Sequence, residues 1–183
     1  MARGIKIAFV TAVAALALTG QAQAVGGNYV FDGGSAKQRT QVRSALNASS
    51  FNWSLVPAQI KIHIGPFGTS DATSGEIWLD GRLLNSGKFA WATVQHEYAH
   101  QIDFFLVNAA TRPRLLGQLG GKGWFQSPGL AHAQLGSERF ASTLAWAYWP
   151  SKDNVLRPTS SKDESAAMAP QKFRAFVKQI VGG

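Results

Sequence analysis

Cysteine is absent from this 183-residue chain, so neither disulfide bonds nor thiolate metal ligands are available to it. Any metal ion that the protein binds must therefore be held by histidine, glutamate or aspartate. The chain has four histidines and ten acidic residues for this purpose. For an exported protein, the absence of disulfides favours a bacterial product that does not rely on oxidative folding.

Acidic residues are scarce, because ten aspartates and glutamates stand against 18 lysines and arginines, which gives a formal charge of +8. The basic residues are scattered along the chain, with no dense run and no basic motif interleaved with aromatic residues. A nucleic-acid partner is therefore not expected. The positive charge is typical of a soluble protein with a loose attraction to anionic polymers or surfaces.

Long hydrophobic runs are missing except near the amino terminus. Residues 7–18 form an apolar run that is too short to span a membrane. It follows Arg3 and Lys6 and precedes an Ala-x-Ala cleavage site that ends at Ala24. We therefore predict a signal peptide over residues 1–24, with cleavage near Ala24. The product is expected to be secreted, either extracellular or periplasmic, with a formal charge of +6 after loss of the two basic residues.

The remaining segment, residues 25–183, is long enough for one domain with a substantial hydrophobic core. It contains no internal repeat, and none of its segments is apolar enough to cross a bilayer. We therefore expect a single domain, without a membrane span and monomeric.

The most informative stretch is residues 91–105, which contains the pattern His-Glu-x-x-His at residues 96–100. In a helix, His96 and His100 lie one turn apart on the same face, because residues four apart are neighbours on the helix surface. Two imidazoles so placed can bind one metal ion. A catalytic zinc needs one more protein ligand and keeps a position open for water. Glu97 can then reach that water as a general base.

Hydrophobic periodicity predicts that this stretch is helical. Apolar residues recur at spacings of three and four, which is the helical period; they are Trp91, Val94, Tyr98, Ile102 and Phe105. His96 and His100 point about 140° away from that apolar stripe, toward a cleft. The predicted helix runs over residues 88–107, with Asn85 or Ser86 as its amino-terminal cap.

The segments before this helix predict a small sheet with one helix. Residues 60–64 and 76–80 alternate apolar and polar side chains, as half-buried strands do. Residues 29–31 are either a strand or a tether. Ser35 with Gln38 forms a capping box that opens a helix ending near Ala48, with Val42 and Leu46 facing inward. Residues 65–75 are expected to be an exposed, mobile loop.

The segments after it predict further helices. Residues 108–127 are expected to be mainly a loop, with room for a short helix around Leu115 and Leu116. Ser127 and Pro128 predict a helix start. The strongest helical pattern covers residues 138–149 and ends at Pro150. A closing helix is expected over residues 163–181, interrupted at Pro170.

Asp103 and Glu138 are the two candidates for a third metal ligand. Asp103 lies on the histidine face, but seven residues from His96 it is about 10.5 Å away along the helix axis. Glu138 lies on a separate predicted helix and can pack with its carboxylate toward the two imidazoles. Glu138 is therefore preferred, the alternative for it being an ordinary carboxylate at a helix amino terminus. Asp103 is expected to orient His100 or to tie the helix to the rest of the fold.

These residues resemble the gluzincin branch of the zincin metallopeptidases, in which a glutamate ligand on a downstream helix follows the His-Glu-x-x-His helix. The resemblance rests on residues 96–100 and on Glu138; Ser142 departs from it, because many gluzincins carry an aspartate there. It implies an α+β, zincin-like fold: a small twisted sheet with packed helices and the motif on a central helix. It also implies that residues 76–80 form the edge strand beside the cleft and pair with an extended substrate.

The resemblance further implies a secreted zinc-dependent peptidase over residues 25–183. Zn²⁺ would be bound by His96, His100 and Glu138, with Glu97 as the general base in hydrolysis of a peptide or protein substrate. His132 is preferred over Tyr148 as the donor that stabilises the oxyanion. The alternative is a non-catalytic zincin-like module that binds an anionic surface polymer or a host protein, with zinc serving stability alone.

Overall fold

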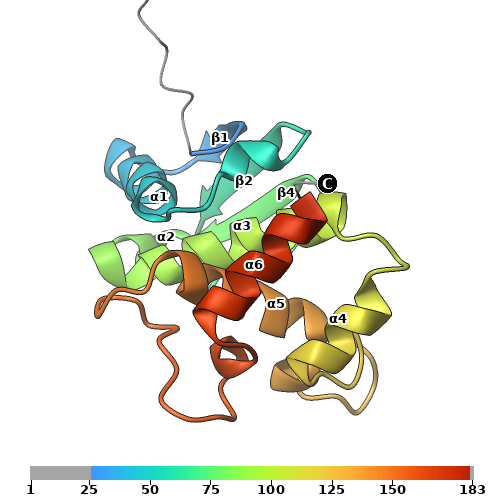
Figure 1. Cartoon of the computed structure of the whole chain (residues 1–183). Helices are drawn as coiled ribbons and strands as arrows, with labels where there is room; N and C mark the ends of the chain where they lie inside the picture. The colour runs from blue at the N-terminus through green and yellow to red at the C-terminus, as the bar shows by residue number, and fades with distance from the viewer. Residues whose placement is uncertain (1–25, 182–183) are drawn as a thin grey trace, which may run out of the picture.

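The computed structural model describes residues 26–181, and the predicted signal segment lies outside this range. The described chain has an α+β fold with one mixed sheet and several helices, as predicted. In Figure 1 the sheet and α1 (Ala36–Ala48) occupy the upper part, and α5 (Gly136–Tyr148) lies in the lower part. Between them runs α3 (Trp91–Leu106), which carries the His-Glu-x-x-His pattern. Within residues 26–181, no helix combines the length and apolarity needed to cross a membrane.

The sheet has the strand order β1-β2-β4-β3. Three strands run parallel to one another: β1 (Tyr29–Gly33), β2 (Ile60–Gly65) and β4 (Glu76–Asp80). β3 (Asp71–Thr73) lies antiparallel to β4 at one edge. The alternation predicted for β2 is confirmed, because its isoleucines are buried while Lys61 is exposed. The sheet therefore presents one apolar face to the core.

The edge strands are β1 and β3, so the prediction that residues 76–80 form an edge is wrong. β4 pairs with β2 on one side and with β3 on the other. The cause is the segment 65–75, which the sequence predicts as a mobile loop. This segment crosses to the edge, forms β3 and turns back through Gly75 into β4. Gly75 has a φ of +87°, a conformation that glycine adopts without steric strain.

Local signals set the boundaries of the first helices. The capping box of α1 is confirmed, since Gln38 donates its backbone N–H to Ser35 and its side chain accepts from the Ser35 backbone. A short helix, α2 (Gly81–Leu84), follows β4 and is capped by Asp80. The predicted cap of α3 is wrong, because the chain enters α3 through a 3₁₀ turn (Gly87–Ala90) without a side-chain cap. Ser86 instead donates its hydroxyl to a carbonyl within the preceding turn.

The part of the chain after α3 combines helices with irregular segments. The helical elements are α4 (Arg112–Leu119), α5, α6 (Pro170–Val181), and 3₁₀ turns at His132–Gln134 and Glu164–Ala166. The predicted helix start at Ser127 and Pro128 is wrong, because Gly129 follows with a φ of +80°, which ends helical geometry at once. α5 begins at Gly136, where a Cβ atom would lie 2.6 Å from the ring of Trp124.

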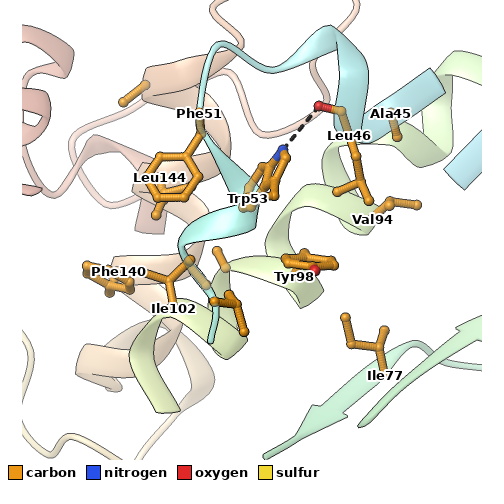
Figure 2. Close-up of a cluster of buried hydrophobic side chains, with 14 of the residues drawn as sticks. Ala45, Leu46, Phe51, Trp53, Ile77, Val94, Tyr98, Ile102, Phe140 and Leu144 are labelled. Carbon is orange, nitrogen blue, oxygen red and sulfur yellow. Dashed lines mark hydrogen bonds between the residues drawn. The ribbon is translucent and has the colours of Figure 1, made fainter. Parts of the chain in front are cut away.

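The hydrophobic core fills the space between the sheet, α1 and α3, and it extends to α5 (Figure 2). Tyr98 of α3 is fully buried against Trp53, with ring centroids 5.3 Å apart. The indole N–H of Trp53 donates to the carbonyl of Leu46, so its one polar atom is satisfied inside the core. Because α5 covers the opposite side of α3, the motif helix is buried on both faces.

Candidate metal centre and cleft

The structure brings together the three residues predicted as metal ligands. His96 and His100 on α3 have their Nε2 atoms 3.1 Å apart. Oε2 of Glu138, in the first turn of α5, lies 3.1 Å from Nε2 of His96 and 3.3 Å from Nε2 of His100. All three possible ligand atoms lie within 4.8 Å of one another. A cluster that compact can bind one metal ion.

Packing of α5 on α3 explains why Glu138 reaches the histidines. The two helices lie side by side, and Glu138 and Ser142 stand four residues apart on the face of α5 that contacts His96. A carboxylate in the first helical turn is also favoured by the helix dipole. The alternative interpretation of Glu138 as an ordinary helix-terminal carboxylate accounts for its position on α5 but not for its contacts with two imidazoles.

The charges of the cluster favour an anionic Glu138. Burial opposes its ionisation, but hydrogen bonds from His100 and His96 outweigh burial and hold the pKa of this carboxyl well below its ordinary value. Burial likewise opposes protonation of His100, yet the hydrogen bond to Glu138 raises the pKa of this imidazole above 6.5. Two imidazoles and one carboxylate match the donor set of three-ligand zinc sites and suit other first-row transition ions as well.

Glu97 lies beside this cluster without a hydrogen-bond partner. Its side chain is 6% exposed and lines a cavity of about 240 Å³ together with His96, His132 and Ser142. Nothing in residues 26–181 donates a hydrogen bond to its carboxylate. Burial raises the pKa of Glu97, an effect that the charges of His96 and His100 partly oppose. A buried carboxylate that faces an open cavity and has no donor is available to accept a proton.

His132, predicted as an oxyanion donor, lies at the mouth of the site. Its Nε2 is 3.1 Å from Oε2 of Glu138, and its Nδ1 is 2.7 Å from Oε1 of Glu164. The ring is 65% exposed and borders the cavities on both sides of the His96–His100–Glu138 cluster. The competing candidate, Tyr148, packs near the end of α5 against Phe51 and lines neither of these cavities.

No family model, curated protein or solved structure matches this chain. The proposed function therefore rests on the geometry of the described side chains.

The cleft extends to both sides of the cluster. One cavity, of about 350 Å³, lies between β3 and the region around α5, and its apolar lining residues are Ala72, Phe104, Phe125 and Leu135. The other is the 240 Å³ cavity beside Glu97, which reaches Leu156. A larger cavity of about 460 Å³ lies beyond Leu156 and is lined by none of His96, His100 and Glu138. The first two cavities therefore flank the cluster, and β3 lines the larger of them.

Gln101, next to His100 in sequence, fixes that wall to α3. Its fully buried amide donates to the carbonyls of Thr73 and Glu76 at 2.9 and 3.2 Å and accepts from the backbone N–H of Gly75 at 2.8 Å. The turn between β3 and β4 is thus held by the same helix that carries the two histidines. Sequence reasoning missed this role, because a polar residue on the apolar side of a helix gives no sign of its partner.

Asp103 ties α3 to the segments that follow it and lies outside the metal cluster. Its fully buried carboxylate accepts from the indole N–H of Trp124 at 3.0 Å and from Nε of Arg112 at 3.3 Å. Burial raises the pKa of this carboxyl, and the hydrogen bond from Trp124 and the charge of Arg112 oppose the rise. Of the two predicted roles, the structure supports the tie to the rest of the fold.

Ser142 and Glu164 are site residues that sequence reasoning did not identify as such. Oγ of Ser142 lies 3.1 Å from Nδ1 of His96 and donates its proton to Oε2 of Glu164 at 2.8 Å. Ser142 is therefore more than a departure from the gluzincin pattern, because it bridges a histidine to a carboxylate. The four-residue spacing from Glu138 could have placed Ser142 on the right face of α5. No sequence signal could have found Glu164, which follows an irregular segment.

Proposed function

We propose that the chain is a secreted zinc-dependent peptidase that hydrolyses peptide bonds with Glu97 as general base. The observation that carries this proposal is the position of Glu97, a buried carboxylate without a hydrogen-bond donor in the same cavity as His96. A zinc site that serves stability alone has no use for such a group. The export signal predicted over residues 1–24 supports the secreted location.

Each side chain of the site would have its own role in peptide hydrolysis. His96, His100 and Glu138 would hold Zn²⁺, which as a Lewis acid lowers the pKa of water in the site and polarises a carbonyl group. Glu97 accepts a proton from the attacking water, whose oxygen forms the new bond to the peptide carbonyl carbon. When the C–N bond breaks, Glu97 returns that proton to the departing amine. In its protonated form, which can donate from both ring nitrogens, His132 would donate from Nε2 to the carbonyl oxygen as negative charge develops on it.

The cleft supports a peptide as substrate. β3 is an edge strand, and its residues Asp71 and Ala72 line the larger of the two cavities beside the cluster. An extended peptide could pair with such an edge by strand addition and lie across the metal-binding side chains. The wall formed by Phe104 and Phe125, whose rings stack with centroids 6.5 Å apart, would take an apolar side chain.

The test is elemental analysis of the purified mature chain combined with a peptidase assay on the same samples. We expect one zinc per chain in the wild type and in Glu97→Gln, with activity only in the wild type. Glu138→Ala should lose both zinc and activity. Asp153→Asn is the matched control, because it removes a charge from an exposed ion pair with Lys88, and neither residue belongs to the cluster.

A wild type without zinc, or one whose zinc is unaffected by Glu138→Ala, would contradict the proposed ligands. Zinc binding with full activity in Glu97→Gln would contradict the proposed base. A zinc protein without peptidase activity would instead favour the non-catalytic binding module.

A further inference from the structure

Glu164 contacts two functional groups of the site with its two carboxylate oxygens. Oε2 accepts from the hydroxyl of Ser142 at 2.8 Å, and Oε1 lies 2.7 Å from Nδ1 of His132. The side chain is 20% exposed, so it is partly shielded from water. It is neither one of the three metal-binding side chains nor the proposed base.

The hydrogen bond from Ser142 to Glu164 determines that Nδ1 of His96 carries a proton. A carboxylate can only accept hydrogen bonds, so the single proton of the Ser142 hydroxyl points to Glu164. Oγ of Ser142 must therefore accept from Nδ1–H of His96, 3.1 Å away. With a proton on Nδ1, Nε2 is the nitrogen of His96 that would bind the metal ion, and it is the atom that faces Glu138 and His100. That is the tautomer which a metal ligand requires.

The second contact aims His132 into the cleft. Because Glu164 accepts from Nδ1–H of His132, the opposite nitrogen, Nε2, is directed at Glu138 and the cavity beside it. A mostly exposed ring would otherwise sample several rotamers. The carboxylate of Glu164 thus orients the imidazole of His132 directly and that of His96 through Ser142.

The backbone around Glu164 is itself fixed. Its carbonyl accepts from the hydroxyl of Thr143 on α5 at 3.2 Å. Just before it, the carboxylate of Asp163 accepts from the backbone N–H groups of Thr159 and Ser160 at 2.6 and 2.9 Å, which holds the preceding turn closed. Ser165 is buried. The backbone position of Glu164 is therefore set by contacts outside the His96–His100–Glu138 cluster.

We propose that Glu164 is the positioning residue of the site, acting on His96 through Ser142 and on His132 directly. This inference rests on the proposed function. It predicts two separable effects, one on metal affinity through His96 and one on turnover through His132. In many gluzincins an aspartate stands where this chain has Ser142; here the serine and Glu164 together would supply the carboxylate.

The experiment compares Glu164→Gln, Ser142→Ala and the double variant Ser142→Asp/Glu164→Gln with the wild type. Asp153→Asn, which removes the same charge at an exposed site, is the control. Zinc affinity is measured by competition with a chelator, kcat and KM with a peptide substrate, and folding by circular dichroism. In the metal-free proteins, imidazole ¹⁵N chemical shifts report which nitrogen of His96 carries the proton.

We expect Glu164→Gln to lose about 10- to 100-fold in zinc affinity, as is typical when the partner of a metal-binding histidine is removed. Its kcat should fall with little change in KM, and His96 should become a mixture of tautomers, since a glutamine can donate to Ser142 as well as accept. Ser142→Ala should lower zinc affinity to a similar degree. The double variant places a carboxylate next to His96, so it should recover zinc affinity and the tautomer but not the kcat that depends on His132.

Zinc affinity and tautomer in Glu164→Gln that equal those of Asp153→Asn would overturn the inference, and so would a double variant that recovers neither. Should Glu164→Gln fail to fold, Ser142→Ala alone decides the His96 contact. A wild type that binds no zinc refutes the proposed function as well. A wild type that binds zinc and cleaves peptides, with Glu164→Gln unchanged, refutes only the role of Glu164.

Discussion

Glu97 and Asp103 are buried carboxylates in different turns of α3, and they differ in the hydrogen bonds that they receive. Asp103 is fully buried and receives hydrogen bonds from Trp124 and Arg112. Glu97 is nearly as buried and receives none from the described residues. Burial raises the pKa of both, but only at Asp103 do direct hydrogen bonds oppose the rise. Burial alone therefore does not distinguish the structural carboxylate of Asp103 from the proposed general base, whereas the presence of donors does.

The largest expected difference is in catalysis. Glu97→Gln should lower kcat/KM by about 10²- to 10⁴-fold, the usual contribution of a general base. Asp103→Asn should leave kcat/KM within a few-fold of the wild type, because its carboxylate faces Trp124 and not the cavity. The measurement is steady-state kinetics on zinc-loaded samples. Equal losses in the two variants would remove the distinction between the two carboxylates.

For stability, the larger loss is expected at Asp103 and the smaller one at Glu97. Asp103→Ala leaves the N–H of Trp124 and the guanidinium of Arg112 without their acceptor, so we expect a loss of about 3 kcal/mol in unfolding free energy. Glu97→Ala removes no hydrogen bond and should cost much less. Urea denaturation of the metal-free proteins measures both values. A larger loss for Glu97→Ala would show that Glu97 holds the fold together after all.

A narrower change tests one contact of Asp103. Trp124→Phe keeps an aromatic ring next to Phe140 but removes the indole N–H, so we expect a loss of about 1.5 kcal/mol, typical of a hydrogen bond to a charged acceptor. The double variant with Asp103→Asn should lose less than the sum of the two single losses, because the two residues interact. Additive losses would mean that the hydrogen bond contributes nothing to stability.

The smallest effect concerns the pH dependence of stability. The folded-state pKa of Glu97 is raised above its ordinary value of 4.5, so the folded chain holds this proton more tightly than the unfolded chain does. The contribution of Glu97 to stability is therefore present below about pH 4.5 and is lost as the pH rises through the raised pKa. We expect metal-free Glu97→Gln to gain stability relative to the wild type over this window. Thermal melts between pH 4 and 8 test this, and a constant difference across the range would contradict it.

Periodic parts of the sequence predict the fold well because their signals are local. The apolar stripe of α3 and the alternation of β2 follow from burial of one face, and the capping box of α1 from contacts within one turn. Glu138 could be predicted as well. The seven-residue spacing along α3 places Asp103 too far from His96, which leaves Glu138 on a neighbouring helix as the candidate.

The remaining parts depend on contacts between distant segments that have no period. β3 forms because residues 71–73 meet β4 across a turn that Gln101 holds, which the composition of that loop does not reveal. The bridge from His96 to Glu164 needs the segment before residue 164 to return to α5. Polar side chains in irregular segments find their partners only in the folded chain, so such contacts have no counterpart in local sequence.

The amide of Gln101 has a consequence for ligand association. Three hydrogen bonds join the β3–β4 turn to the helix position directly after His100. A peptide that added to β3, as proposed, would therefore meet an edge whose distance from His96, His100 and Glu138 is already set before contact. Little conformational entropy of the protein needs to be lost on binding, so the cost of association falls mainly on the peptide. Extended, stiff peptides should accordingly bind this cleft more tightly than flexible ones of the same composition.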